Sequence, residues 1–134
     1  MDNVSRTVRS RTMASVRSRC NKSTEIRLVS ILRKAHFVGW RRRNSRLPGR
    51  PDFVFPKTKL AIFVDGCFWH GCPRCYRQPS SNVAYWRSKI DRNRKRDLAV
   101  TRALCKLGWK VLRIWECQLK DAIRIVRRIR RGLQ

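Results

Sequence analysis

The stretch LAIFVDGCFWHGCPRCYR, residues 60–77, contains the strongest structural signal in the sequence. It opens with a continuous apolar run, LAIFV, which is typical of a β-strand buried on both faces. One acid, one histidine, three cysteines and two adjacent aromatic residues follow within a few turns of chain. The stretch therefore predicts a central strand and, directly after it, a loop that concentrates the reactive side chains of the protein.

The segments on either side of this stretch predict an α/β fold. A helix should begin near residue 23, with Leu28, Ile31 and Leu32 at the spacing of a buried stripe. The other expected elements are strands over 37–43, 52–55, 60–64 and 110–115, a long helix over 82–107 and a basic amphipathic helix at the C-terminal end. On the long helix, the side expected to be buried carries Trp86, Ile90, Leu98, Thr101, Leu104 and Cys105. This order predicts a central mixed sheet with helices on its faces.

With 134 residues the chain has room for one domain. Residues 1–22 are rich in Arg, Ser and Thr and poor in apolar residues, which predicts a flexible basic N-terminal arm. Residues 23–134 are expected to form the single folded domain.

The charge of the chain indicates a polyanionic partner. Lys and Arg number 34 against 8 Asp and Glu, a net charge of +26, and such a charge destabilises a compact protein unless a polyanion shares it. Nucleic acid fits, since cationic side chains release its counterions; an anionic membrane is the competing partner. No apolar run approaches the roughly 20 residues of a spanning helix, and the N-terminus lacks the apolar segment of a signal peptide. We therefore expect a cytoplasmic monomer with no membrane partner.

Four of the six cysteines predict a structural zinc site. Thiols in a reducing compartment more often bind metal than form disulfides. Cys67, Cys72 and Cys75 lie in the loop, and Cys117 follows the last expected strand, which should return beside the central one. Four thiolates make a closed tetrahedral zinc site. Cys20, in the arm, and Cys105, expected as a small core residue of the long helix, are left over. The alternatives are six free thiols, or a site in which His70 replaces one cysteine.

Three acids and His70 predict a metal-dependent nuclease. Asp52 and Asp65 lie on adjacent strands, and Glu25 lies in the first turn of the preceding helix. Such carboxylates can hold Mg²⁺ beside a phosphodiester, and His70 can deprotonate the attacking water. The alternative is structural, with Asp52 capping its strand and Asp65 forming an Asx turn. Asp91 and Asp97 are interpreted as part of a solvated helix face.

The motifs LPGRPDFVF, FVDGCFWHGCPRC and LGWKVLRIWEC, in this order, resemble the very short patch repair (Vsr) DNA mismatch endonucleases of bacteria. The resemblance covers residues 12–121. It implies a restriction-endonuclease-like core and Mg²⁺-dependent nicking of one strand of duplex DNA, 5′ to the thymine of a T:G mismatch that arises from deamination of 5-methylcytosine. It further implies a nucleoid-associated protein, with repair polymerase and mismatch-repair proteins as possible partners.

The resemblance also implies roles for particular residues. Asp52 and the backbone carbonyl of Val64 would hold magnesium, His70 would be the catalytic base and Glu25 an acid near the metal. The zinc ligands would be the four cysteines named above. The residues implied to enter the base stack are Phe68, Trp69, Trp86 and Met13. The best-known member has histidine at the positions of Asp65 and Cys72, which leaves Asp65 either a metal ligand or a residue that assists proton transfer.

Two other functions compete with this one. The first is a restriction- or homing-type endonuclease of the same fold with another DNA target. The second is a zinc-stapled nucleic-acid-binding protein without catalysis. A comparison of the cleavage of mismatched and matched duplexes distinguishes the first alternative from a mismatch-repair endonuclease. Mg²⁺-dependent cutting of any kind excludes the second alternative.

Overall fold

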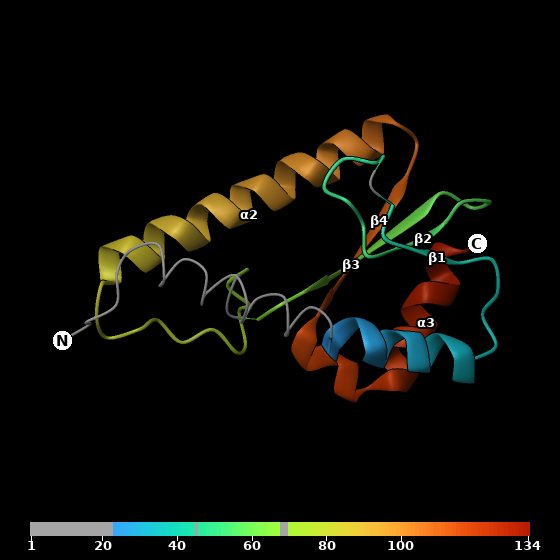
Figure 1. The fold of residues 1–134 in the computed structure, drawn as a ribbon, viewed down its shortest axis with the longest axis horizontal. Helices are drawn as coiled ribbons and strands as arrows, with labels where there is room; N and C mark the ends of the chain where they lie inside the picture. Colours follow the sequence, from blue (N-terminus) through green and yellow to red (C-terminus); the bar gives the residue numbers. More distant parts are fainter. Residues whose placement is uncertain (1–22, 45, 68–69) are drawn as a thin grey trace.

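The computed structural model describes residues 23–44, 46–67 and 70–134 (Figure 1). Residues 23–34 form a first helix, which carries no label in Figure 1. The remaining elements are β1 (Arg41–Arg42), β2 (Phe53–Phe55), β3 (Leu60–Asp65), α2 (Val83–Lys106), β4 (Lys110–Trp115), the 3₁₀ helix η1 (Glu116–Lys120) and α3 (Ala122–Gly132). The predicted arm lies outside the described residues, so its conformation remains a prediction.

One four-stranded sheet, in the order β1-β2-β3-β4, forms the centre of the fold. The pairs β1·β2 and β2·β3 are antiparallel, and β3·β4 is parallel with Asp65 opposite Trp115. A parallel pair needs a long crossover connection, which α2 provides. The predicted mixed sheet, an antiparallel meander followed by a crossover helix and a fourth strand, is confirmed. The carboxyl ends of β3 and β4 lie at the same edge.

The sheet has an apolar core on each face, because alternate side chains of a strand point to opposite faces. On one face the first helix, η1 and α3 pack with Phe53, Ile62 and Ile114. On the other face Leu104 of α2 packs with Val54, Ala61 and Phe63. Figure 1 shows the same separation, with α2 on one side of the sheet and α3 and the first helix on the other. All six residues of β3 are buried, as expected of a strand covered on both faces.

The first strand is shorter than predicted. Only Arg41 and Arg42 pair with β2, although a strand over 37–43 was expected. Two of the residues that precede this strand have a positive φ, His36 at 61° and Gly39 at 82°. The indole Nε1 of Trp40 donates a hydrogen bond to the carbonyl of Phe37 at 3.2 Å. The chain therefore turns through this segment, which an extended strand cannot do.

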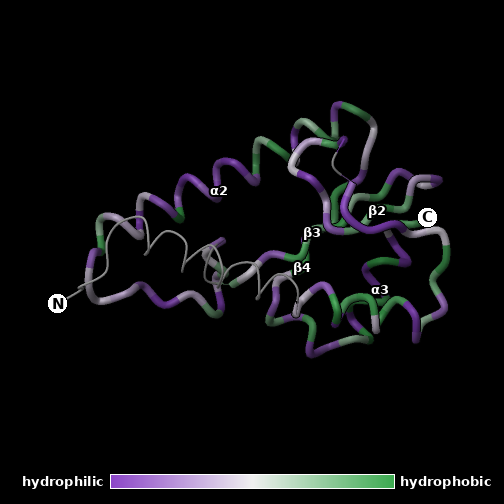
Figure 2. Tube along the Cα trace, viewed as in Figure 1, coloured by the Kyte–Doolittle hydropathy of each residue, from purple (hydrophilic) through white to green (hydrophobic). Residues whose placement is uncertain are grey.

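The buried side of α2 also differs from the prediction. Ile90 and Leu104 are buried as expected, but Leu98 is 53% exposed and Cys105 is exposed. The predicted core position of Cys105 is therefore wrong. The part of α2 that begins at Val83 extends beyond the sheet (Figure 1), and Figure 2 shows that α2 is hydrophilic over much of its length. Cys105 comes one residue after the buried Leu104, a rotation of about 100° around the helix, and Leu98 lies seven residues before Cys105 on the same side, so both lie away from the side that packs on the sheet.

Other local predictions hold. Leu28, Ile31 and Leu32 of the first helix are buried, and Gly108 follows α2 with φ at 86°, a conformation that favours glycine at a helix end. The short helix η1 was not predicted. None of the helices in the described ranges is long and apolar enough to cross a membrane.

Candidate active site and cysteine cluster

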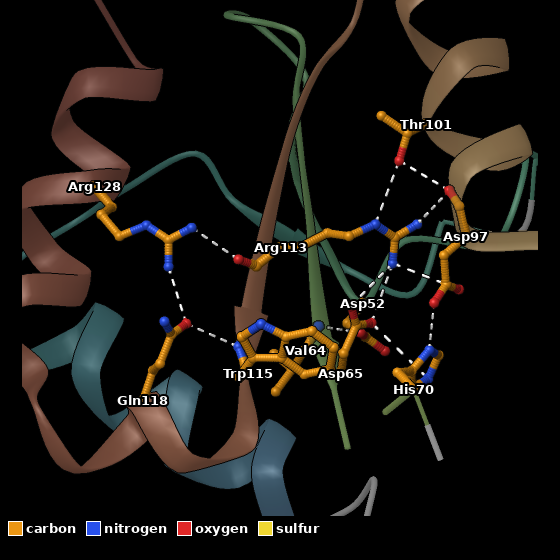
Figure 3. A network of polar contacts seen from close by, with 10 residues as sticks. All are labelled: Asp52, Val64, Asp65, His70, Asp97, Thr101, Arg113, Trp115, Gln118 and Arg128. Atoms are coloured by element: carbon orange, nitrogen blue, oxygen red, sulfur yellow. Dashed lines mark hydrogen bonds and ion pairs between the residues drawn. The ribbon is translucent and has the colours of Figure 1, made fainter. Parts of the chain in front are cut away.

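Asp52 lies just before β2, where its side chain reaches across to β3 (Figure 3). Its Oδ2 atom accepts a hydrogen bond from the backbone N–H of Val64 at 2.8 Å. Burial raises the pKa of Asp52 from its ordinary value of 3.8 to about 6, and the negative charges of Glu25 and Asp65 add to the increase. The Val64 N–H and the charge of His70 oppose it. The carboxylate is thus held in one orientation and has a strong tendency to bind a cation.

His70 lies beside two carboxylates. Its Nδ1 is 2.6 Å from Oδ2 of Asp97 on α2, and its Nε2 is 4.0 Å from Oδ1 of Asp65 at the end of β3. A carboxylate only accepts, so Nδ1–H is the donor and Nε2 is left to accept a proton. Burial lowers the pKa of His70, but the hydrogen bond to Asp97 and the charges of Asp65 and Asp97 raise it more, so the net pKa lies above the ordinary value.

Asp97 corrects the prediction of a solvated helix face. Its side chain is 23% exposed and binds His70 instead of water. The reason is the helical repeat: Ile90, Asp97 and Leu104 are seven residues apart, about two turns, so the acid lies on the buried side of α2. This spacing is the sequence signal that could have identified Asp97.

Asp65 ends β3 and pairs with an arginine. Its carboxylate is 7% exposed, and Nη1 of Arg113 on β4 lies 3.1 Å from each of its two oxygens. Burial raises the pKa of Asp65, while His70 and Arg113 act in the opposite direction. Arg113 was not singled out in the sequence; its place in an otherwise apolar strand, KVLRIW, is the signal that could have drawn attention to it.

Glu25 lies in the first turn of the first helix, as predicted, and is buried. Its Oε2 atom pairs with Nη2 of Arg42 at 2.7 Å and with Nη2 of Arg43 at 3.2 Å. Its negative charge raises the pKa of Asp52, so the two acids belong to one electrostatic environment. The structure therefore gathers Glu25, Asp52, Asp65 and His70 near the carboxyl end of β3.

The four predicted cysteines form a compact cluster. The Sγ atoms of Cys67, Cys72, Cys75 and Cys117 all lie within 4.8 Å of one another, and Cys72 and Cys117 are 3.9 Å apart. Sulfur atoms around tetrahedral zinc, at about 2.3 Å from the ion, are about 3.8 Å apart, whereas a disulfide requires about 2.05 Å. The donor set and its spacing therefore fit zinc.

The backbone around Cys72 also suits a thiolate. Burial raises the pKa of Cys72, but the backbone N–H groups of Arg74 and Cys75 and the neighbouring thiols outweigh it, and the net pKa lies below the ordinary value. His70 faces the carboxylates of Asp65 and Asp97. This position argues against the alternative in which the histidine replaces a cysteine.

The residues expected to contact the bases are less well placed. Trp86 is half-buried near the start of α2, with its ring 5.1 Å from that of Tyr85. Phe68, Trp69 and Met13 lie outside the described residues. Their insertion into the base stack remains a prediction.

The chain is similar to known DNA endonucleases. Residues 1–77 match the sequence profile of the family described as DNA mismatch endonuclease Vsr. The chain is 43% identical over 122 residues to the type II nicking enzyme V.XorIIP of Xanthomonas oryzae pv. oryzae, covering 88% of this chain and 86% of that protein. It is 39% identical over 114 residues to the DNA mismatch endonuclease Vsr of Escherichia coli, covering 84% of this chain and 71% of that protein. Identity reaches 50% over 78 residues with the type II nicking enzyme V.NaeI of Lentzea aerocolonigenes, where the match covers 58% of this chain and about half, 47%, of that protein.

Proposed function

The chain belongs to the Vsr family of DNA mismatch endonucleases, hydrolases that act on DNA, and on this premise we propose that it nicks one strand of duplex DNA 5′ to the thymine of a T:G mismatch. Hydrolysis depends on Mg²⁺, and the nick initiates very short patch repair of deaminated 5-methylcytosine. The restriction-endonuclease-like core is part of this proposal. Its support is the observed order of a meander, a crossover helix and a parallel strand.

The observation that carries the proposal is the convergence of Asp52 and His70 near the end of β3 (Figure 3). Oδ2 of Asp52 is fixed by the Val64 N–H, and the other oxygen of Asp52, together with the Val64 carbonyl, would hold magnesium. Nε2 of His70 accepts a proton from the attacking water, while Asp97 holds the ring and stabilises its protonated form. When bound, magnesium would polarise the phosphate and stabilise the leaving oxygen.

Zinc in the cysteine cluster would fasten the loop of Cys67, Cys72 and Cys75 to Cys117 at the start of η1. His70 lies within that loop, between Cys67 and Cys72. The zinc therefore fixes the catalytic base relative to β3 and β4 and contributes to folding. It has no part in the chemical step.

Recognition of the mismatch is assigned to Phe68 and Trp69, with Trp86 and Met13 assisting. Separation of a base step costs a few kcal/mol and costs least at a mismatch, which is already weakly stacked. The protein would work as a cytoplasmic, nucleoid-associated monomer. A repair polymerase and mismatch-repair proteins would act with it on the nicked strand.

A nicking assay tests the proposal. The substrates are a duplex with one T:G pair and otherwise identical duplexes with T:A and C:G pairs, each with and without Mg²⁺. We expect cleavage only of the thymine strand, only in the T:G duplex and only with Mg²⁺. Absence of any Mg²⁺-dependent cut would contradict the endonuclease assignment, and equal cutting of all three duplexes would contradict the mismatch specificity.

A second candidate function is favoured by the names of two relatives. V.XorIIP and V.NaeI are both named type II nicking enzymes, which suits a nuclease of the same fold that serves a restriction system at a defined sequence. In the same assay this candidate predicts nicking of a fully paired duplex that carries its target sequence. Matched duplexes of several sequences, compared with the T:G duplex, therefore distinguish the two functions.

A further inference from the structure

The side chains of Asp65, His70 and Asp97 form a second group with the composition of a metal site. One oxygen or nitrogen atom from each lies within 4.8 Å of the others. Two carboxylates and an imidazole are ligands that Mn²⁺ and Zn²⁺ accept. The trio could therefore compete with Asp52 for a divalent cation and could occupy the nitrogen of His70.

Arg113 already places a positive charge against this group (Figure 3). Its Nη1 lies 3.1 Å from both oxygens of Asp65 and 3.7 Å from Oδ1 of Asp97. A guanidinium remains protonated at every physiological pH. The oxygens that a metal ion would need are thus already in contact with a cation.

The guanidinium is fixed on its other edges as well. Nη2 donates to the backbone carbonyl of Asp97 at 3.1 Å, and Nε donates to Oγ1 of Thr101 at 3.3 Å. Its carbon lies 4.4 Å from the centre of the Phe63 ring, a cation–π distance, and the side chain is only 23% exposed. All three nitrogens have partners from β3 or α2, so the group is held in place.

We propose that Arg113 is a positioning residue that acts as the resident cation of the Asp65–His70–Asp97 group and keeps divalent metal out of it. Asp65 is then a counter-ion of Arg113, and Asp52 remains the carboxylate that binds the catalytic metal. His70 keeps Nε2 free for a proton. The role assigned to Asp52 rests on the proposed function, whereas the exclusion of metal by Arg113 can be tested without DNA or catalysis.

The test is a titration of the zinc-loaded protein with Mn²⁺ in the absence of DNA. The concentration of free Mn²⁺ is measured at each step from its electron paramagnetic resonance signal. With Arg113 in place, Asp52→Asn should remove the Mn²⁺ site. Asp65→Asn should weaken Mn²⁺ binding by less than about tenfold, because Asp65 contributes a nearby charge but is not a ligand. Arg113→Met should add about one further Mn²⁺ per chain, bound by the freed trio. The double variant Arg113→Met/Asp65→Asn should lose that additional ion.

Arg96→Met is the matched control, since it removes an exposed arginine next to Asp97 and should add no ion. The inference is overturned if Asp65→Asn weakens Mn²⁺ binding as much as Asp52→Asn, or if folded Arg113→Met gains no ion. If Arg113→Met fails to fold, the isosteric Asp65→Asn variant still decides whether Asp65 is a ligand. A parent protein that binds no Mn²⁺ would contradict the metal role of Asp52, while a gain in Arg113→Met would still support the role of Arg113.

Discussion

At the level of single residues, the carboxylates near the end of β3 differ in their partners. Glu25 pairs with Arg42 and Arg43, and Asp65 and Asp97 both lie beside Arg113. Among the residues that the structure describes, no ion pair is found for Asp52, and burial raises its pKa to about 6. Asp52, whose charge is opposed by burial and is not balanced by an arginine among the described residues, is thus well prepared to bind an added cation.

This arrangement predicts that Asp52→Asn stabilises the metal-free fold while it abolishes nicking. The carboxyl pKa is 3.8 ordinarily and about 6 in the folded protein, so the folded state binds the proton more tightly than the unfolded state. The bound proton therefore stabilises the folded state. This stabilisation is fully present below about pH 3.8 and is lost as the pH rises through about 6. At pH 7 the ionised carboxylate therefore costs about 3 kcal/mol, an amount that follows from two pKa units.

Thermal melts without added magnesium at pH 4 and pH 7 measure this effect. The asparagine variant should melt higher than the parent at pH 7, and the difference should shrink at pH 4. Asp91→Asn, a change at an exposed position of α2, is the control and should alter neither melt. A variant that melts lower at pH 7 would show that the carboxylate stabilises the fold.

Asp97→Asn should shift the pH–rate profile of nicking in a defined direction. Asp97 raises the pKa of His70 through a hydrogen bond and through its charge. Without that charge the imidazole loses its proton at lower pH, so the acidic limb of the profile should move to lower pH. The maximal rate should fall too, because the protonated ring formed during catalysis is less stabilised.

His70→Ala is the reference variant for this experiment. It should lower the rate by about 10²- to 10⁴-fold, the usual contribution of a general base, and it should leave the zinc content unchanged. An acidic limb that does not move in Asp97→Asn would mean that Asp97 only holds the loop. Loss of zinc in His70→Ala would make the histidine a zinc ligand.

Reasoning from the sequence reached most of the site residues but not their electrostatic partners. Asp52, His70 and the cysteines stand out because each is rare in its surroundings, and the structure does bring each set together. Arginine is a common residue type in this basic chain, and Asp97 lies in a run of charged residues, DRNRKRD, that is typical of a solvated helix face. The roles of Asp97 and Arg113 depend on the rotation of α2 and on the register of β3 and β4, which the local sequence does not fix.

At the level of elements, the predictions succeeded where hydrophobic pattern and chain direction agree. β4 covers the predicted residues 110–115, and β3 differs by one residue because its continuous apolar run leaves little choice. The predictions for the segment before β1 and for the exposed side of α2 were wrong. There the outcome depends on turns with positive φ and on the rotation of α2, which places Leu98 and Cys105 away from the side that packs on the sheet.

The cysteine cluster predicts that Cys117→Ser unfolds the protein more readily than any single change among the catalytic residues. Cys117 is the member of the cluster that comes from η1, just after β4, and not from the loop. A site with one thiolate fewer binds zinc far more weakly, and structural zinc contributes folding free energy directly. Metal analysis and thermal melting measure the effect. Cys105→Ser, at an exposed position outside the cluster, is the control and should leave both unchanged.

At the level of the whole molecule, the net charge is +26, and the helices on both faces of the sheet carry part of its positive charge. The basic residues of α2 are Arg87, Lys89, Arg92, Arg94, Lys95, Arg96, Arg102 and Lys106, and those of α3 are Arg124, Arg127, Arg128, Arg130 and Arg131. The carboxylates beside His70 lie on the α2 side, since Asp97 belongs to that helix. DNA that reaches the active site should therefore contact α2 more than α3.

This asymmetry gives a prediction for the salt dependence of DNA binding. Each phosphate contact that is lost lowers the slope of log K against log salt concentration by about 0.9. Arg87, in the first two turns of α2, and Arg127, on α3, are both exposed and carry the same charge. Arg87→Ala should lower the slope by about 0.9, equally for T:G and matched duplexes, because phosphate contacts carry no sequence information.

Arg127→Ala is the matched control, since it removes the same charge from the opposite face and should leave the slope within the error of measurement. The experiment is a titration of labelled duplex at four or more salt concentrations for the parent and both variants. Equal changes in the two variants would mean that the charge acts only as a diffuse field around the molecule. A larger change in Arg127→Ala would place the DNA against α3, and the route from bound duplex to His70 would then have to pass around the edge of the sheet.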